Sequence, residues 1–416
     1  MERMNGAVLI GQSGGPTAVI NASALGCIEA ALACPDINKV YGAAHGIVGV
    51  LNDRIYDLTQ EDPDELQLMR HTPSSVFGAC RYKLADPLAD DTDYLRILDV
   101  FTKYNIRYFF YIGGNDSMDT CSKISGFLAE HDYKCNVIGI PKTIDNDLPI
   151  TDHCPGFGSA AKYVANICME VCMDTRVYDI GSMTVIEIMG RDAGWLTAAS
   201  ALAKARGLGP DLIYVPEVPF NMIDFLSDVT RVYEKNGDVM VTVSEGIKDK
   251  NGTYIASYFT DNTNEKDAFG HPKMGGLATS LANFAKSKIN AKVRGIELSL
   301  LQRCAVHLAS ETDIMEAYEV GKKAFEYAFD GISDKMIGLI RVSNSPYKSE
   351  TCLIDLVDVA NAVKRIPREW INEAGNDLRK DFLDYTYPLI QGDVQMPYKD
   401  GLPRFARLKR ILTREM

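Results

Sequence analysis

Short apolar runs that end in glycine or proline recur along the chain, and segments of helical character separate them. Each run is continuously rather than alternately apolar, as expected for strands of a parallel sheet that is covered on both faces. This alternation predicts an α/β fold with doubly wound, mostly parallel sheets. The expected strands are Ala7–Ile10, Val40–Ala43, Tyr108–Ile112, Asn136–Ile140, Thr184–Ile188, Leu212–Val215 and Val239–Val243. The expected helices are Asn21–Ala33, Pro87–Tyr104, Met118–His131, Ser159–Asp174, Trp195–Arg206 and Phe220–Asn236.

Length and charge narrow the class of protein. The 416 residues are enough for two domains, and a net charge of -12 argues against binding nucleic acid or an anionic membrane surface. The N-terminus has no signal-like leader and no apolar run approaches a membrane span, so we expect a cytoplasmic protein. The ten cysteines include no Cys-x-x-Cys pair, and we interpret them as reduced core thiols rather than as a zinc site built on Cys168 and Cys172.

Polar, glycine-rich loops follow most of the expected strands. In open parallel sheets, ligands bind beyond the carboxyl ends of the strands. One such loop is usually only a turn, but several at neighbouring strand ends predict a single polar cleft. The loops are Gly11–Asn21, Gly113–Thr120, Pro141–Asp152, Met189–Trp195 and Pro216–Phe220.

The first of these loops allows three interpretations. Residues Gly11–Gly15 fit the G-x-S-x-G pattern of a hydrolase nucleophile, but none of the six histidines shows a pairing pattern for a triad. A dinucleotide site would need an acidic residue after the second strand, where the chain has His45. We therefore favour a phosphate-binding turn, in which Gly14 and Gly15 let backbone amides approach the anion.

The loop Pro141–Asp152 adds acid–base chemistry. Phosphoryl transfer to an alcohol needs an acceptor for the hydroxyl proton and cations around the leaving oxygens. Asp145 and Asp147 can accept a proton, and Lys142 with Thr143 supplies a cation and a hydroxyl beside them. This combination predicts a phosphoryl-transfer site.

The ordered set of motifs resembles the phosphofructokinase family. From about residue 6 to residue 330 the chain carries SGG, GACR, GGNDS, PKTIDND, GFGSA, MGR and PEVPF in the family's order. The resemblance implies phosphoryl transfer to O1 of fructose 6-phosphate, in the cleft between two doubly wound, Rossmann-like domains. It also implies a homodimer or homotetramer with the active site near a subunit interface.

The resemblance further implies a division into two domains. Residues 1–155 plus about 302–360 are expected to bind the phosphoryl donor. Residues of about 156–301 plus 361–416 are expected to bind the sugar phosphate and to carry a C-terminal extension.

Roles for single residues follow from the same resemblance. Asp145 is expected to act as the base, with Asp147, Lys142 and Thr143 as the other catalytic residues. The residues expected to bind the donor are Gly15, Arg81, Gly114, Asn115, Asp116 and Ser117, of which Asp116 and Asn115 would help to hold Mg²⁺. The residues expected to bind the sugar phosphate are Thr143, Asp145, Met189, Gly190, Arg191, Glu217, Arg294 and Arg303.

Two positions bear on the phosphoryl donor. ATP-using members of the family have glycine where this chain has Asp116 and Lys142. Asp116 would repel the α-phosphate of a nucleotide, and Lys142 would offer a cation to a departing inorganic phosphate. We therefore predict that pyrophosphate is the donor and that the reaction runs in both directions, with an ATP-dependent enzyme as the alternative.

Other departures from the family concern the metal and the sugar. Asn115 replaces the magnesium-site acid, Leu300 replaces a histidine of the sugar-phosphate segment, and Ser182 replaces an arginine that crosses between subunits. These changes leave open a longer acceptor such as sedoheptulose 7-phosphate. They also leave open a non-catalytic homologue that only binds sugar phosphate.

Overall fold

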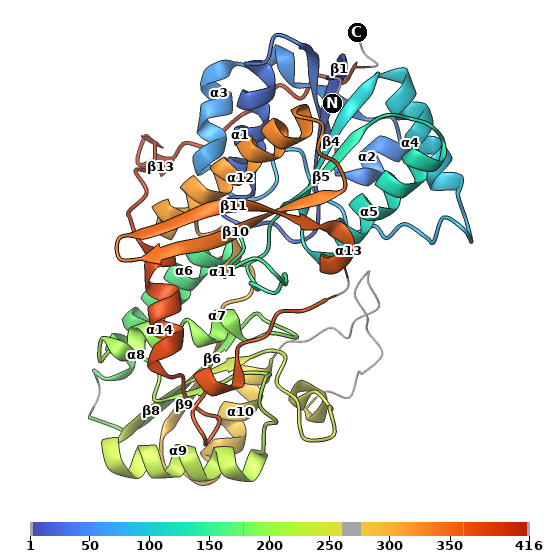
Figure 1. The fold of residues 1–416 in the computed structure, drawn as a ribbon. Coiled ribbons are helices and arrows are strands. Elements are labelled where there is room, and N and C mark those ends of the chain that lie inside the picture. Colours follow the sequence, from blue (N-terminus) through green and yellow to red (C-terminus); the bar gives the residue numbers. More distant parts are fainter. Residues whose placement is uncertain (1–2, 178, 260–275, 361, 414–416) are drawn as a thin grey trace.

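A computed structural model describes residues 3–177, 179–259, 276–360 and 362–413. In Figure 1 the chain forms an upper and a lower body, each built around its own sheet. The upper sheet has seven strands in the order β11-β10-β5-β4-β1-β2-β3. Its inner strands are parallel, and the edge strands β3 and β11 are antiparallel to their neighbours. The strands are β1 (Gly6–Gln12), β2 (Ile37–Ala43), β3 (Ile55–Asp57), β4 (Ile106–Gly113), β5 (Asn136–Pro141), β10 (Lys335–Asn344) and β11 (Tyr347–Asp355).

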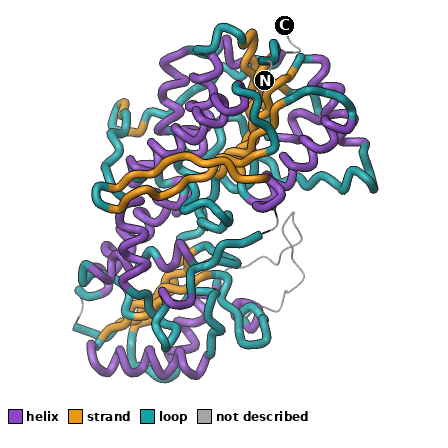
Figure 2. The backbone as a smooth tube through the Cα atoms, viewed as in Figure 1, coloured by secondary structure: helices purple, strands orange, loops and turns teal. Residues whose placement is uncertain are grey.

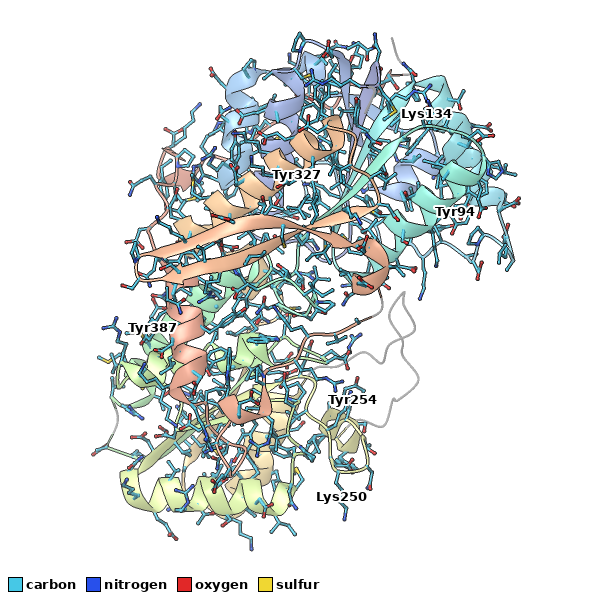
Figure 3. All side chains as sticks on the ribbon, viewed as in Figure 1. Tyr94, Lys134, Lys250, Tyr254, Tyr327 and Tyr387 are labelled. Carbon is cyan, nitrogen blue, oxygen red and sulfur yellow. The ribbon has the colours of Figure 1, made fainter. Side chains whose placement is uncertain are left out.

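Helices cover both faces of the upper sheet. Alternate residues of β1 point to opposite faces, so Val8 belongs to the core cluster under α1 and α12, and Leu9 to the cluster under α4 and α5. The ring of Tyr94 on α4 packs 5.1 Å from that of Phe127 on α5 (Figure 3). The helices of this body are α1 (Ile20–Leu32), α2 (Ile47–Leu51), α3 (Pro63–Leu68), α4 (Thr92–Lys103), α5 (Asn115–Glu130), α12 (Glu311–Phe329) and α13 (Leu356–Val359).

Two glycines bring α1 and α12 into close contact. A Cβ atom on Gly26 would lie 2.0 Å from the carbonyl oxygen of Tyr318, and one on Gly321 would lie 1.9 Å from that of Ser23. Neither distance is sterically allowed, so the helix pair depends on both glycines.

The lower sheet has four parallel strands in the order β7-β8-β6-β9. Its apolar side chains also point to both faces: Val185 packs in the core cluster under α9 and α10, and the next residue, Ile186, packs in the cluster under α6. The strands are β6 (Ser182–Ile188), β7 (Leu212–Tyr214), β8 (Asp238–Ser244) and β9 (Lys292–Glu297). The helices are α6 (Phe157–Thr175), α7 (Trp195–Ala198), α8 (Ala201–Ala205), α9 (Met222–Asn236), α10 (Leu277–Lys286), α11 (Leu301–Cys304) and α14 (Lys380–Thr386).

The fold class predicted from the sequence is confirmed. All seven expected strands are present, and their ends lie within three residues of the predicted ones. The expected helix Trp195–Arg206 is wrong as a single element, because it is divided into α7 and α8. At the break the Ser200 hydroxyl donates to the carbonyl oxygen of Thr197 (2.7 Å), a local bond that competes with the helical pattern.

The C-terminal region contacts both bodies (Figure 2). Ile366 and Phe382 pack into the core of the lower body. Residues 404–413 instead return to the upper body, where Glu61 accepts backbone N–H bonds from Lys409 (2.7 Å) and Arg410 (2.8 Å). This last stretch thus contacts the body expected to bind the donor, and the division into two domains stays a prediction. A short β12–β13 hairpin (Tyr398–Lys399 and Leu402–Pro403) precedes it.

Within the described ranges, no helix is both long enough and apolar enough to span a bilayer.

Candidate active site

A cavity of about 380 Å³ opens at the carboxyl ends of strands from both sheets. Loops after β1, β4 and β5 of the upper sheet line it, together with loops after β6 and β8 of the lower sheet. Strands β1 and β4 are neighbours whose following strands lie on opposite sides, which is the switch point where α/β sheets bind ligands. The lining residues are Ser13–Thr17, Arg81, Tyr82, Gly114–Ser117, Lys142–Asp145, Asp147, Met189, Arg191–Ala193, Glu245 and Arg303.

Most of the predicted site residues therefore lie around one cavity. All four residues expected to be catalytic and all six expected to bind the donor line it. Of the residues expected to bind only the sugar phosphate, Met189, Arg191 and Arg303 line it, whereas Gly190, Glu217 and Arg294 do not. Among the described residues that line the cavity there is no histidine, which leaves Ser13 without the partner that a hydrolase serine needs.

Three basic groups converge on the first loop. The Lys142 ammonium donates to the carbonyl oxygen of Gly15 (2.6 Å). A Cβ on Gly15 would lie 3.0 Å from Nη1 of Arg303 and 3.9 Å from Nη2 of Arg81. Glycine at this position thus leaves room for both guanidinium groups, and the preceding Gly14 adopts a positive φ of 71°.

For two of these cations, Lys142 and Arg303, burial disfavours the charge. Burial lowers the pKa of Lys142 to about 8, with Arg303 and Arg81 adding to the effect, while Asp145 and Asp147 oppose it. Burial and the neighbouring Arg81 also lower the pKa of Arg303. An anion bound among the three groups would relieve this repulsion, so the pocket is suited to phosphate.

A carboxylate suited to proton transfer lies beside the cations. Burial raises the pKa of Asp145 to about 7, and the negative charges of Asp147 and Glu245 add to the shift. The Asp145 backbone N–H donates to the Thr143 hydroxyl (3.0 Å), which shapes the loop. A carboxyl group with a pKa near neutrality is an effective general base.

Oxygen ligands for a divalent cation are present at the start of α5. The Asn115 side-chain amide donates to Asp147 (3.3 Å), and its Oδ1 is buried with no partner within the described part of the chain. No cluster of three or more His, Cys, Asp or Glu side chains arranged for a metal exists among the described residues. Mg²⁺ does not require one, because it is commonly held by one or two carboxylates, waters and substrate phosphates. The unpartnered amide oxygen beside Asp116 and Asp147 fits that mode of binding.

The loop after β6 reaches the cavity from the lower body. Gly190 has no atom among the lining groups, but its N–H donates to Glu245 (3.4 Å) and its carbonyl oxygen accepts from the Ser244 hydroxyl. Glu245 itself lines the cavity, although it was not among the residues expected there. It follows β8 directly, so the rule that selected the other loops would have found it.

Glu217 and Arg294 lie elsewhere. One carboxylate oxygen of Glu217 accepts the N–H groups of Gly194 (2.9 Å) and Ile366 (3.1 Å), so this residue holds backbone instead of lining the cavity. Arg294 lies on the edge strand β9 and pairs with Asp174 (3.0 Å). Neither side chain is among the lining residues, and their expected contacts with the sugar phosphate stay predictions.

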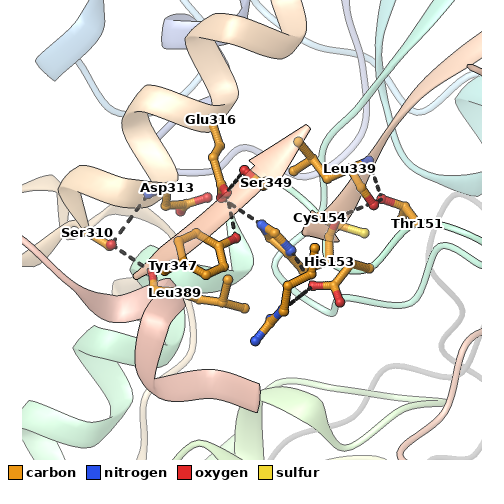
Figure 4. A network of polar contacts seen from close by, with 12 residues as sticks. Thr151, His153, Cys154, Ser310, Asp313, Glu316, Leu339, Tyr347, Ser349 and Leu389 are labelled. Atoms are coloured by element: carbon orange, nitrogen blue, oxygen red, sulfur yellow. Dashed lines mark hydrogen bonds and ion pairs between the residues drawn. The ribbon is translucent and has the colours of Figure 1, made fainter. Parts of the chain in front are cut away.

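A buried polar network supports the far end of residues 142–152, the loop that carries Asp145 and that we name the base loop (Figure 4). The His153 ring bonds Asp152 through Nδ1 (2.8 Å) and Glu316 of α12 through Nε2 (2.6 Å). Despite burial, which acts against the charge, these two carboxylates raise the pKa of His153 to about 9. Asp313, also on α12, accepts the N–H groups of Gly156 (2.9 Å) and Ser159 (2.8 Å) at the start of α6. The network joins the base loop to helices of both bodies.

Comparison with known proteins gives the family. The family model described as Phosphofructokinase matches residues 7–327. A pyrophosphate–fructose 6-phosphate 1-phosphotransferase of Halomonas elongata is 44% identical over 403 residues, which cover 96% of this chain and 95% of that protein. A sulfofructose kinase of Alkalicoccus urumqiensis is 32% identical over 94% of this chain and 96% of its own length. The crystal structure of a pyrophosphate-dependent phosphofructokinase from Marinobacter aquaeolei superposes with a TM-score of 0.88 at 39% identity, covering 98% of this chain and 97% of that one.

Two doubly wound domains around a cavity lined by basic and carboxylate side chains are typical of a protein that transfers phosphoryl groups. The chain belongs to the phosphofructokinase family.

Proposed function

We propose that this chain transfers a phosphoryl group from pyrophosphate to O1 of fructose 6-phosphate, giving fructose 1,6-bisphosphate and phosphate in a reversible reaction. The observation that carries the proposal is the group of Lys142, Arg81 and Arg303 around Gly15, with Asp145 in the same cavity. Relatives at 44% and 42% identity that bear the corresponding name support it.

Asp145 acts as the base in this proposal. Its raised pKa of about 7 keeps the carboxyl close to the balance point at which it can take the O1 proton of the sugar. The alkoxide that develops then attacks the terminal phosphorus. Lys142, with a pKa of about 8, carries its charge at neutral pH and stabilises the phosphate that leaves.

Asp116 and Lys142 together select the donor. Asp116 lines the cavity at the first turn of α5, where its negative charge opposes the extra phosphate of a nucleotide. Pyrophosphate carries no nucleoside, so it does not need to occupy the space beside Asp116. Mg²⁺ would be held by Asn115 and Asp116, with Asp147 close by, and would supply charge neutralisation for the pyrophosphate oxygens.

The sugar phosphate is expected to contact Met189, Gly190 and Arg191, with Arg303 near its phosphate. In a homodimer or homotetramer, Arg294 of one copy binds the phosphate of the sugar that lies in the cavity of a neighbouring copy. This arrangement is supported by its place on the edge strand β9 and by Leu300 and Leu301 after that strand, which are 55% and 58% exposed. Sedoheptulose 7-phosphate is the further acceptor to test, and we expect the protein to act in the cytoplasm.

A donor comparison tests the proposal. The purified chain is assayed with fructose 6-phosphate, Mg²⁺ and either pyrophosphate or ATP at equal concentration, with Asp145→Asn as the inactive control. We expect turnover with pyrophosphate and at least tenfold less with ATP. Comparable turnover with ATP would overturn the donor assignment, and no turnover with either would favour a non-catalytic sugar-phosphate-binding homologue.

A further inference from the structure

Residues 364–366, which we name the strap, run between the two bodies and contact loops of both. The strap comes after α13 of the upper body in the chain. Its last residue, Ile366, is buried in the core of the lower body. Along three residues it contacts the base loop (residues 142–152) and the sugar loop (residues 189–194). Its contacts are made mainly through backbone groups and one lysine.

The first strap residue holds the base loop. The backbone N–H of Lys364 donates to the carbonyl oxygen of Asp147 (2.7 Å). Its ammonium donates to the carbonyl oxygens of Asp152 (2.8 Å) and Thr151 (3.2 Å). One residue therefore joins three points of the loop that carries Asp145.

Lys364 is itself fixed by the lower body. The Trp195 indole N–H donates to the carbonyl oxygen of Lys364 (2.9 Å). The Lys364 ammonium lies 5.3 Å from the centre of the Trp195 ring, within the range of a cation–π contact. Trp195 begins α7, directly after the sugar loop.

The other two strap residues hold the sugar loop. The Arg365 guanidinium donates to the carbonyl oxygen of Asp192 (3.3 Å). The Ile366 N–H donates to the same Glu217 oxygen that accepts the N–H of Gly194. Glu217 thus connects the strap to the sugar loop by accepting a backbone N–H from each.

The base loop has a conformation that needs external support. Asn146 and Ile150 have positive φ angles of 53° and 69°, and a β-branched residue rarely adopts this region. Tyr385 of α14 adds a second hold on the loop: its hydroxyl donates to the carbonyl oxygen of Asp152 (2.7 Å) and accepts from the side-chain amide of Asn146 (2.8 Å).

We propose that Lys364 is a positioning residue and that the strap sets the base loop against the sugar loop, so that Asp145 faces the hydroxyl it deprotonates. The effect on catalysis rests on the proposed function, whereas the effect on the loop does not. A displacement of about 1 Å in a catalytic group can cost roughly a hundredfold in rate. Loss of the strap contacts should therefore lower kcat more than it weakens binding.

The test compares Lys364→Met with Lys204→Met. Lys204 also bonds a carbonyl oxygen of the lower body, that of Asp211 (2.8 Å), and an acid of the C-terminal region, Asp377 (2.6 Å). Both of its partners lie outside the two loops, so it controls for the general loss of a lysine contact. Kinetic constants for pyrophosphate and fructose 6-phosphate are measured, and amide hydrogen exchange is followed in peptides covering residues 142–154.

For Lys364→Met we expect kcat to fall on the order of 10- to 100-fold, KM values to stay within about threefold, and loop amides to exchange faster. Lys204→Met should keep kcat within about twofold and leave loop exchange unchanged. A Lys364→Met protein with wild-type kcat and wild-type loop exchange would overturn the proposal. If the wild type itself shows no turnover with pyrophosphate, the proposed function fails and loop exchange alone decides on the strap.

Tyr385→Phe provides a second variant should Lys364→Met not fold. It removes one hydroxyl from the same loop and keeps the aromatic packing of Tyr385 against Trp195 and Trp370. We expect faster loop exchange and a smaller fall in kcat, again with little change in KM. Unchanged kcat and unchanged exchange in this variant would contradict the proposal.

Discussion

Replacing Lys142 with methionine is expected to slow the chemical step and leave sugar binding nearly intact. Methionine retains most of the buried stem but removes the ammonium that lies 2.6 Å from the carbonyl oxygen of Gly15. With a pKa of about 8, Lys142 is roughly 90% charged at pH 7, so the variant removes a real charge from the donor site.

The expected magnitude follows from the charge that develops on the leaving phosphate. Removing one preorganised donor from a buried anion site costs about 100- to 1000-fold in kcat, or roughly 3–4 kcal/mol of barrier. The Gly15 carbonyl oxygen also loses its partner, whereas removal of a buried charge whose pKa is lowered to about 8 acts in the opposite direction on the free energy of unfolding. The KM for fructose 6-phosphate should change little, because Met189 and Arg191 of the sugar loop keep their positions.

The assay measures kcat and KM for pyrophosphate-dependent phosphorylation at pH 7, together with thermal unfolding. Lys123→Met is the matched control, because Lys123 on α5 pairs with Asp119 (2.7 Å) and does not line the cavity. A folded Lys142→Met protein whose kcat lies within threefold of the wild type would show that the Lys142 charge does not stabilise the leaving phosphate.

Three more results are expected. Asp116→Gly should raise the ratio of ATP to pyrophosphate turnover by about tenfold or more, because it removes an electrostatic repulsion of roughly 1.4 kcal/mol between Asp116 and the nucleotide. An unchanged ratio in the donor assay would show that Asp116 does not determine which donor is used. The raised pKa of His153, about 9 against an ordinary 6.5, stabilises the fold by about 3 kcal/mol below pH 6.5, and this contribution is lost as the pH rises through 9. Melting temperatures of wild type and His153→Gln should therefore converge as the pH rises from 6 to 10, and parallel curves would contradict this. Gly26→Ala should destabilise by about 1–3 kcal/mol in urea unfolding because its Cβ would lie 2.0 Å from a Tyr318 oxygen, whereas Gly126→Ala, with nothing within 4 Å of its Cβ, should be neutral or stabilising; equal effects would show that the close helix contact is unimportant.

The central strands could be predicted from the sequence because they are buried on both faces. Strand β4 (Ile106–Gly113) is apolar almost throughout, and only Arg107 within it is not buried. Strand β9 (Lys292–Glu297) lies at the edge of the lower sheet, carries three charged residues and has no apolar run to reveal it. The antiparallel edge strand β11 (Tyr347–Asp355) was missed for the same reason, because only Ile354 of its nine residues is buried.

The part of the site that directly follows buried strands could be predicted from the sequence. Lys142, Asp145 and Asp116 follow buried strands, and the fold brings those ends together. Local sequence does not say which way a carboxylate at a strand end points: Glu217, which the family resemblance indicated, does not line the cavity, whereas Glu245 does. The difference lies in partners far along the chain, since Glu217 is occupied by the N–H groups of Gly194 and Ile366.

The long-range contacts of the C-terminal region had no local signal at all. Lys364 bonds residues more than 200 positions earlier, and its surrounding sequence resembles an ordinary solvent-exposed stretch. Likewise, the backbone after Pro403 is held by distant carboxylates, because Glu65 accepts the N–H of Arg407 and Glu61 accepts those of Lys409 and Arg410.

The central claim is that Asp145 and Lys142 move one phosphoryl group from pyrophosphate to a sugar hydroxyl. Phosphorus-31 NMR of the purified chain with fructose 6-phosphate, pyrophosphate and Mg²⁺ tests it most directly. We expect one new 1-phosphate ester and one orthophosphate for each pyrophosphate consumed, with the same mixture reached from the products. Two orthophosphates per pyrophosphate without a sugar ester, or no consumption of pyrophosphate, would contradict it.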